Sequence, residues 1–198
     1  MKLSRKDFLK FFAGGAILLS IFRILSLDPN NNRSDIVRPP GALEESVFNL
    51  LCIRCGLCLE VCPTECIVFA GLNDGVGTVN TPKIDAMIGE CEFYRGRCEE
   101  EMQCSKQCPT KALQLVGKDK VRVGTVDFHP DYCIAYLGKE CIVCAEMCPV
   151  PGAIENTEDL KPIFNEEKCI GCGSCVYSCP ANPKALSLSS RGSRRTEL

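Results

Sequence analysis

The sequence predicts an α+β fold built from two tandem units, each made of short hairpins and short helices. Three observations lead to this prediction. Sixteen of the 17 cysteines in this chain of 198 residues fall into four runs that share a C-x3-C-P end. A short apolar stretch follows each run, bounded by Gly, Asn or Pro, as in small hairpins. Trp is absent and aromatic residues make up 7% of the chain, so a conventional apolar core would be thin, and small units of this kind depend on metals or disulfides.

The spacing of the cysteines indicates what they bind. The first and last runs read C-x2-C-x2-C-x3-C-P, the pattern that ligates iron–sulfur clusters in bacterial ferredoxins. The third run stretches its first gap to seven residues, and the second run has gaps of six and five residues before its C-x3-C-P end. In chain order the runs are Cys52, Cys55, Cys58 and Cys62; Cys91, Cys98, Cys104 and Cys108; Cys133, Cys141, Cys144 and Cys148; Cys169, Cys172, Cys175 and Cys179.

The repeat predicts four [4Fe–4S] clusters in two bacterial ferredoxin-like units of two clusters each. In such ferredoxins the last cysteine of each run ligates the cluster of the neighbouring run. We expect the metal-free chain not to fold, because the clusters would act as its core. The expected ligand groups for the cluster iron are Cys52, Cys55, Cys58 and Cys108; Cys91, Cys98, Cys104 and Cys62; Cys133, Cys141, Cys144 and Cys179; Cys169, Cys172, Cys175 and Cys148.

A disulfide scaffold and a zinc site are also rich in cysteine, but neither fits the spacing. Disulfide scaffolds do not repeat it, and a zinc-binding interaction module needs only four ligands, usually as two separated pairs. His129 is the only histidine, which excludes a Rieske centre. The chain has no Ser/His/Asp pattern and no nucleotide motif, so we predict no catalytic residue and an electron carrier rather than an enzyme. A formal net charge of −2 gives nucleic-acid binding no electrostatic support.

Residues 1–27 have the layout of an export signal, with a positive start and an apolar run from Phe11 to Leu27. Residues 4–10 resemble the twin-arginine signal S-R-R-x-F-L-K at every position except Lys6. Export of a folded chain would protect clusters from an oxidising compartment. We expect the segment to be cleaved or to stay as a membrane anchor, its apolar run being at the short limit for spanning. An amphipathic helix of a cytosolic protein is the alternative.

The rest of the chain divides at changes of composition. We expect a linker over 28–46, a first ferredoxin-like unit over 47–117, a second over 118–190 and a disordered tail over 191–198. A helix is predicted over 43–51, and short helices around each C-x3-C-P. Strand-like stretches lie at 67–70, 76–79, 112–116, 121–128, 153–154, 161–164 and 185–188.

Cys66 lies outside the four runs. We expect it to be a small buried side chain under the first cluster, with a spare ligand or a redox-sensitive thiol as alternatives. Gly56, Gly171 and Gly173 are expected to let the backbone turn tightly, so that its N–H groups face sulfur.

The whole pattern resembles the NapG/MauM ferredoxin-type family. An export-like start, an opening C-I-R-C-G-L-C run, irregular second and third runs and a closing regular run carry the resemblance, best at 52–63, 133–149 and 169–180. The resemblance implies four [4Fe–4S] clusters and a place on the periplasmic side of the cytoplasmic membrane. It also implies electron flow from a quinol-oxidising, NapH-like iron–sulfur partner in the membrane to a periplasmic reductase or cytochrome, as in anaerobic respiration. The alternative is an electron-transfer subunit of a molybdopterin oxidoreductase or hydrogenase.

Overall fold

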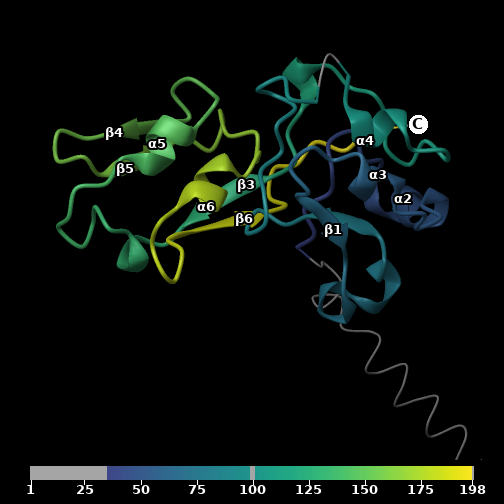
Figure 1. Ribbon diagram of the computed structural model, residues 1–198, viewed down its shortest axis with the longest axis horizontal. Coiled ribbons are helices and arrows are strands. Elements are labelled where there is room, and N and C mark those ends of the chain that lie inside the picture. The colour runs from purple at the N-terminus through teal and green to yellow at the C-terminus, as the bar shows by residue number, and fades with distance from the viewer. Residues whose placement is uncertain (1–34, 99–100, 198) are drawn as a thin grey trace, which may run out of the picture. The chain divides into compact units, whose positions relative to one another are not determined.

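The computed structural model describes residues 35–98 and 101–197 (Figure 1). Its contacts group Asp35–Leu198 into one compact unit. The signal or anchor expected over residues 1–27 lies outside the described residues. Within the part that is described, no helix is both long and apolar enough to cross a membrane.

Short α-helices accompany the cysteine runs, as predicted. Helix α2 (Glu45–Leu51) leads into the first run. Each of the other four helices begins at the residue before the third cysteine of a run, so the helix sets the direction of that thiol and of the cysteine four residues later. They are α3 (Leu57–Glu60), α4 (Gln103–Lys106), α5 (Val143–Met147) and α6 (Ser174–Ser178).

Among the described residues, the strands form three antiparallel pairs. Two pairs are hairpins, each lying between the two cysteine runs of one half of the chain. The third pair joins the first and last strands of the second half, with Thr125 opposite Ser189, next to α6 in Figure 1. The pairs are β1 (Ile67–Phe69) with β2 (Pro82–Ile84), β4 (Ile154–Asn156) with β5 (Pro162–Phe164), and β3 (Thr125–Phe128) with β6 (Leu186–Ser189).

The first half has a reduced form of the third pair. Ala42 and Leu113 form an isolated antiparallel bridge, in which the Gln114 N–H donates to Gly41 O at 2.7 Å. Gly41 has φ +77°, and a Cβ there would lie 1.9 Å from the Gln114 carbonyl oxygen, so only glycine allows this approach. The strand predicted over 112–116 is therefore a single bridge, and each half consists of one hairpin closed by a pairing of its two ends.

The strand predicted over 76–79 is wrong. This stretch belongs to two consecutive 3₁₀ turns, η1 (Leu72–Asp74) and η2 (Val76–Thr78). The Asp74 carboxylate accepts the Gly71 N–H at 2.7 Å, and the Thr78 hydroxyl donates to Asp74 O at 2.9 Å. These local bonds satisfy the backbone without a partner strand, so the hairpin partner of β1 begins later, at Pro82. Two further 3₁₀ turns are η3 (Lys118–Lys120) and η4 (Pro130–Tyr132).

The expected linker is part of the core over its described residues. Arg38 is completely buried and donates to Thr81 Oγ1 and Pro82 O, both at 2.7 Å. Its guanidinium pairs with Glu45 and lies 4.7 Å from the centre of the Phe48 ring. Burial raises the pKa of Glu45, but the Arg38 hydrogen bond and charge outweigh it and leave that pKa below its usual range. The turn-forming prolines beside Arg38 thus fix a packed, extended segment rather than a free one.

The C-terminal segment also differs from the expected disordered tail. Thr196 forms a parallel bridge with Leu43 and donates its N–H to Ala42 O at 3.0 Å. The Arg194 N–H donates to Arg122 O at 2.7 Å. Composition alone favours a frayed end, but these backbone bonds fix residues 194–196 against both halves of the chain.

Apolar packing crosses the boundary expected between residues 117 and 118. Val121 and Val123 belong to the cluster of buried residues that surrounds Phe48 in the first half. Ala86 belongs to the cluster around Val126 and Val176 in the second half. The two halves therefore share core residues instead of packing separately.

We expect Arg38→Ala to lower stability by roughly 1–3 kcal/mol, because it leaves buried acceptors at Thr81 and Pro82 unpaired. The measurement is the temperature at which visible absorbance is lost on heating under anaerobic conditions. Lys139→Ala, at an exposed position, is the control and should not move this temperature. An unchanged transition in Arg38→Ala would mean that the segment before α2 does not stabilise the fold.

Candidate iron–sulfur centres

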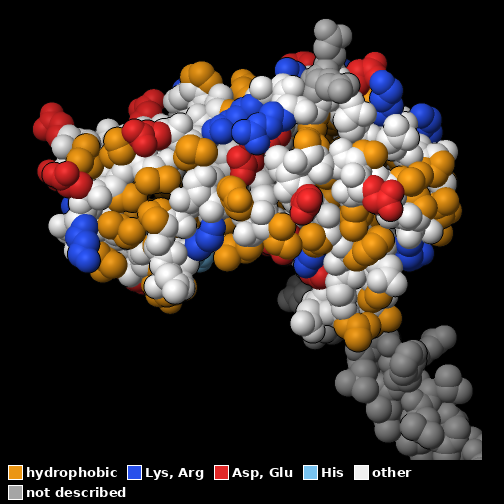
Figure 2. All heavy atoms as spheres, viewed as in Figure 1, with side chains coloured by type: hydrophobic (Ala, Val, Ile, Leu, Met, Phe, Trp, Pro, Cys, Tyr) orange, Lys and Arg blue, Asp and Glu red, His pale blue; other side chains and the backbone are white. Residues whose placement is uncertain are grey.

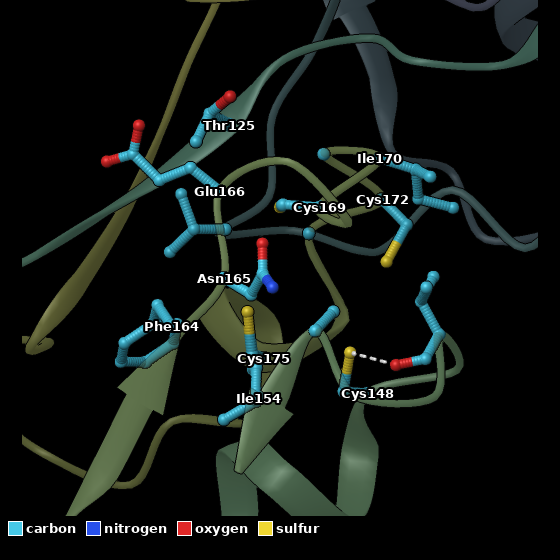
Figure 3. Close-up of a pocket in the computed structure, with 15 residues that line it drawn as sticks. Thr125, Cys148, Ile154, Phe164, Asn165, Glu166, Cys169, Ile170, Cys172 and Cys175 are labelled. Atoms are coloured by element: carbon cyan, nitrogen blue, oxygen red, sulfur yellow. Dashed lines mark hydrogen bonds between the residues drawn. The ribbon is translucent and has the colours of Figure 1, made fainter.

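Four cysteines line one cavity in the second half, which we call site IV: Cys148, Cys169, Cys172 and Cys175. The sulfur atoms of Cys148, Cys172 and Cys175 face the space between them (Figure 3). Helix α6 positions Cys175, and the loop before this helix positions Cys169 and Cys172. The structure thus brings together four cysteines that the sequence assigns to one cluster.

Glycines shape the site IV loop on both sides of Cys172. Gly171 has φ +72°, and a Cβ there would lie 2.5 Å from Gly124 N. Gly173 has φ +82°, and its Cβ would lie 2.8 Å from the Ala86 Cβ. Both the backbone conformation and the close contacts require glycine. This local chain reversal buries Cys172, and the burial raises its pKa, although a hydrogen bond from the Ser174 backbone opposes that rise.

A second cavity in the same half, site III, is lined by the other expected group: Cys133, Cys141, Cys144 and Cys179. Phe128 and Phe164 form part of its wall, with their ring centres 4.9 Å apart. Tyr136 packs edge-on against Phe128 at 5.3 Å. These rings shield the thiols from water on one side of the cavity.

In the first half, one cavity contains five cysteines. Its lining includes Cys91, Cys98 and Cys104 from the irregular run, Cys62 from the first run, and Cys66. We call the group Cys62, Cys91, Cys98 and Cys104 site II. The long gaps of the irregular run therefore still bring all three of its first cysteines to one place.

The remaining group is site I, formed by Cys52, Cys55, Cys58 and Cys108. Cys58 lies within electrostatic reach of the other three: burial raises the pKa of Cys58 to about 12, and the charges of Cys104 from site II and of Cys52, Cys108 and Cys55 add to the rise. Cys55 is exposed, and its neighbours Ile53 and Leu57 are 62% and 38% exposed. Figure 2 shows hydrophobic side chains gathered over the region that Figure 1 labels α2 and α3. Site I is therefore the group with a thiol open to an apolar surface.

The thiols are buried where a thiolate is costly. Burial raises the pKa of Cys104 to about 12 and that of Cys144 to about 11, and nearby thiols add to each rise. Metals bind the thiolate, so a cationic centre is needed to hold several of these sulfurs in the charged form. Among residues 35–98 and 101–197, no three Cys, His, Asp or Glu side chains lie close enough to hold a single metal ion. The donor set of each site suits a cluster that spreads its four thiolates over four irons.

Backbone contacts connect the sites of the two halves. The Cys91 N–H of site II donates to Cys172 O of site IV at 2.7 Å, and these two thiols also lie within electrostatic reach. Cys58 of site I is similarly close to Cys104 of site II. Cys175 of site IV is close to Cys144 of site III. The sites therefore follow one another in the order I, II, IV, III.

The sequence predicts another place for Cys66 and does not single out Glu92, but the structure places both residues at site II. Cys66, expected under the first cluster, lies at the second, with its Sγ 3.6 Å from Cys62 Sγ. Its hydrogen bond lowers the pKa of Cys62 to about 5. Glu92 is 1% exposed, and neither carboxylate oxygen has a hydrogen-bond partner, although Arg97 Nε lies 3.6 Å away and Arg95 Nη1 4.0 Å away. The only signal in the sequence for Glu92 is its position as an acidic residue directly after Cys91, at the start of an irregular gap.

These sites define a class: a ferredoxin-type iron–sulfur protein that transfers electrons. Residues 46–68 and 160–181 each match the family described as "4Fe-4S binding domain". The matches contain the first run and the last run, which are the two runs of regular spacing.

Known relatives identify the family. The methylamine utilization ferredoxin-type protein MauM of Methylophilus methylotrophus is 33% identical, over 93% of this chain and 85% of the relative. The ferredoxin-type protein NapG of Escherichia coli is 32% identical, over 88% and 79%. The ferredoxin-type protein NapF of Haemophilus influenzae is 31% identical, over 81% and 85%. The chain belongs to the NapG/MauM family of ferredoxin-type proteins.

We expect Cys66→Ser to retain its full iron content, because site II has four other cysteines and a cluster needs four ligands. The measurement is iron and acid-labile sulfide per chain after anaerobic purification. Cys104→Ser is the matched control and should lose about four irons. Loss of the same amount of iron in Cys66→Ser would make Cys66 a ligand.

Proposed function

We propose that this protein relays single electrons through four [4Fe–4S] clusters, bound at sites I to IV by sixteen cysteines in two tandem ferredoxin-like units. The observation that carries the proposal is the composition of each site. Every site combines the first three cysteines of one run with the last cysteine of the other run in the same half. That exchange of the fourth ligand is characteristic of two-cluster ferredoxins.

The chain's own contribution is to hold, bury and polarise the sulfur atoms. The bound clusters supply one-electron chemistry. Backbone N–H groups bond to the sulfurs of two expected ligands: Arg54 to Cys52 and Ser174 to Cys172. Such bonds raise the reduction potential, whereas buried negative charge lowers it. Site II lies beside the buried Glu92 carboxylate, which pairs with Arg97 at 3.6 Å and with Arg95 at 4.0 Å, so we propose that its negative charge lowers the potential of this cluster only in part.

The order of the sites supports a linear relay with sites I and III at its ends. The Cys91–Cys172 hydrogen bond joins the two halves at the middle of that series. We propose that a partner exchanges electrons at site I, where Cys55 is exposed between Ile53 and Leu57. An apolar surface beside an open ligand lets a partner come close while excluding water.

We further propose that the donor is a quinol-oxidising, NapH-like iron–sulfur protein of the membrane, and that the acceptor is a periplasmic reductase or cytochrome. The twin-arginine-like residues 4–10 and the following apolar run support export to the periplasmic side of the cytoplasmic membrane. The naming of relatives as NapG and as methylamine utilization proteins supports a respiratory or methylamine-linked chain. Nucleic acid is not among the proposed partners, since the formal net charge is −2.

Iron and acid-labile sulfide on the anaerobically purified full chain should each come to about sixteen per chain. Dithionite reduction should produce EPR signals of S = 1/2 centres that interact, because neighbouring sites lie close together. About twelve irons would mean that one site, with the irregular site II as the first to examine, holds no cluster. Zinc in place of iron would overturn the proposal.

We expect Cys172→Ala to lose one cluster and to destabilise the second half, because it removes a ligand of site IV alone. Iron should fall by about four per chain, and the EPR signal of site I should persist. Cys55→Ala is the matched variant and should remove the site I signal instead. Retention of all iron in Cys172→Ala would contradict the assignment of Cys148, Cys169, Cys172 and Cys175 to one cluster.

A further inference from the structure

Away from the cysteines, a cavity of about 400 Å³ gathers four basic side chains and no carboxylate: Lys120, Arg122, Arg194 and Arg195. The rest of its wall is apolar or backbone, including Val116 and Gly117. None of the four cluster sites contributes a cysteine to it. The cavity is therefore separate from the electron-transfer sites.

The fold brings these cations together from distant parts of the sequence. Lys120 ends the 3₁₀ turn η3, and Arg122 follows two residues later. The C-terminal segment reaches them through the Arg194 N–H, which donates to Arg122 O at 2.7 Å, and through the bridge between Thr196 and Leu43. Like-charge repulsion opposes such a gathering, and a bound anion would relieve it.

The hydrogen bonds of Arg122 and Arg194 within the described chain go to neutral oxygens. Arg122 Nη2 donates to Glu166 O at 2.8 Å and to Thr125 Oγ1 at 3.4 Å, while its Nε is buried with no hydrogen-bond partner. Arg194 Nη1 donates to Asp119 O at 3.4 Å. Among residues 35–98 and 101–197, no ion pair involves Lys120, Arg122 or Arg194.

The nearby carboxylates do not neutralise the cavity. Arg195 lies 3.9 Å from Glu45, with only 13% of its side chain exposed, but Glu45 is also the partner of the buried Arg38. Burial lowers the pKa of Arg195, partly opposed by Glu45. Asp119 lies behind the wall at Gly117, where an added Cβ would meet its Oδ1 at 2.5 Å. Positive charge therefore exceeds negative charge around the cavity.

We infer that this cavity binds a phosphate-bearing anion, as free phosphate or as the headgroup of an acidic lipid. Guanidinium groups offer paired donors that match phosphate oxygens, and a lysine adds a compact point charge. The volume lies within the ~300–1,000 Å³ typical of small-ligand sites. Lys120 and Arg194 are exposed and form no ion pair within the described chain, so both can donate to such an anion.

The test is calorimetric titration of the full, cluster-loaded chain with inorganic phosphate at low salt. The wild type should bind one phosphate per chain. Lys120→Gln/Arg194→Gln changes two exposed side chains, so the visible spectrum should be retained while affinity falls about tenfold or more. Lys111→Gln/Lys139→Gln makes the same charge change at other exposed positions and should leave the affinity unchanged.

Vesicles distinguish the two sources of phosphate. Co-sedimentation is compared on phosphatidylcholine alone and on phosphatidylcholine with phosphatidylglycerol, for the wild type and both double variants. Binding that needs phosphatidylglycerol and weakens only in Lys120→Gln/Arg194→Gln identifies a lipid headgroup. Phosphate binding without that vesicle effect identifies a free anion. No saturable phosphate binding, with equal vesicle binding of both double variants, would overturn the inference, as would an equal loss in the control variant.

Discussion

The structure depends on one electrostatic constraint: thiols that must become thiolates are gathered in small, water-poor cavities. Burial raises the pKa of Cys58, Cys104 and Cys144 to about 11 or 12, so these side chains favour the neutral thiol until a metal centre binds. Cations supply both the charge and the contacts that the thin apolar core lacks. Helices and hairpins are accordingly short, and their main task is to aim sulfur atoms.

The two halves of the chain are joined by contacts close to these thiols, so they are not independent. The Cys91 N–H bonds to Cys172 O, and Ala86 packs against the loop that contains Gly173. Val121 and Val123 of the second half pack in the apolar cluster of the first half, and Ala86 of the first half packs in that of the second. Sites II and IV are thereby held as neighbours by backbone and core contacts of the protein itself, which a flexible connection between two ferredoxin-like units would not achieve.

The cysteine groups are predictable from the sequence because they follow from local spacing. Three cysteines with two residues between each must share one loop, and the short helix that follows directs the fourth thiol toward the neighbouring site. Cys91 and Cys98, which precede irregular gaps, can also be assigned to a group, because their run ends in the same C-x3-C-P as the other three. The helix predicted over 43–51, found over 45–51, and the second hairpin are also readable from apolar spacing and turn residues. The second strand of the first hairpin is not, because local hydrogen bonds turn residues 76–78 into a 3₁₀ helix and the strand begins at Pro82.

What escapes prediction depends on contacts between residues far apart in the chain. Arg38 looks like a linker residue until Thr81 and Pro82, more than 40 positions later, accept its hydrogen bonds. Arg195 looks like part of a solvated tail, yet it donates to Ile36 O at 3.3 Å across 159 positions. The basic cavity has no local pattern at all, and Glu92 has only its position directly after Cys91. The composition of a segment gives its residue types, but not the distant residues that contact and bury them.

The interleaving of the runs also bears on how such a protein changes over generations. Site III takes Cys179 from the last run, and site IV takes Cys148 from the third run. A deletion that removes either run would leave both cavities with an incomplete set of thiols. The thiol sets stay complete only when a pair of runs is gained or lost together with its hairpin, and the core residues shared by the two halves must then find new neighbours. A chain built in this way should change its number of complete cysteine groups by two at a time.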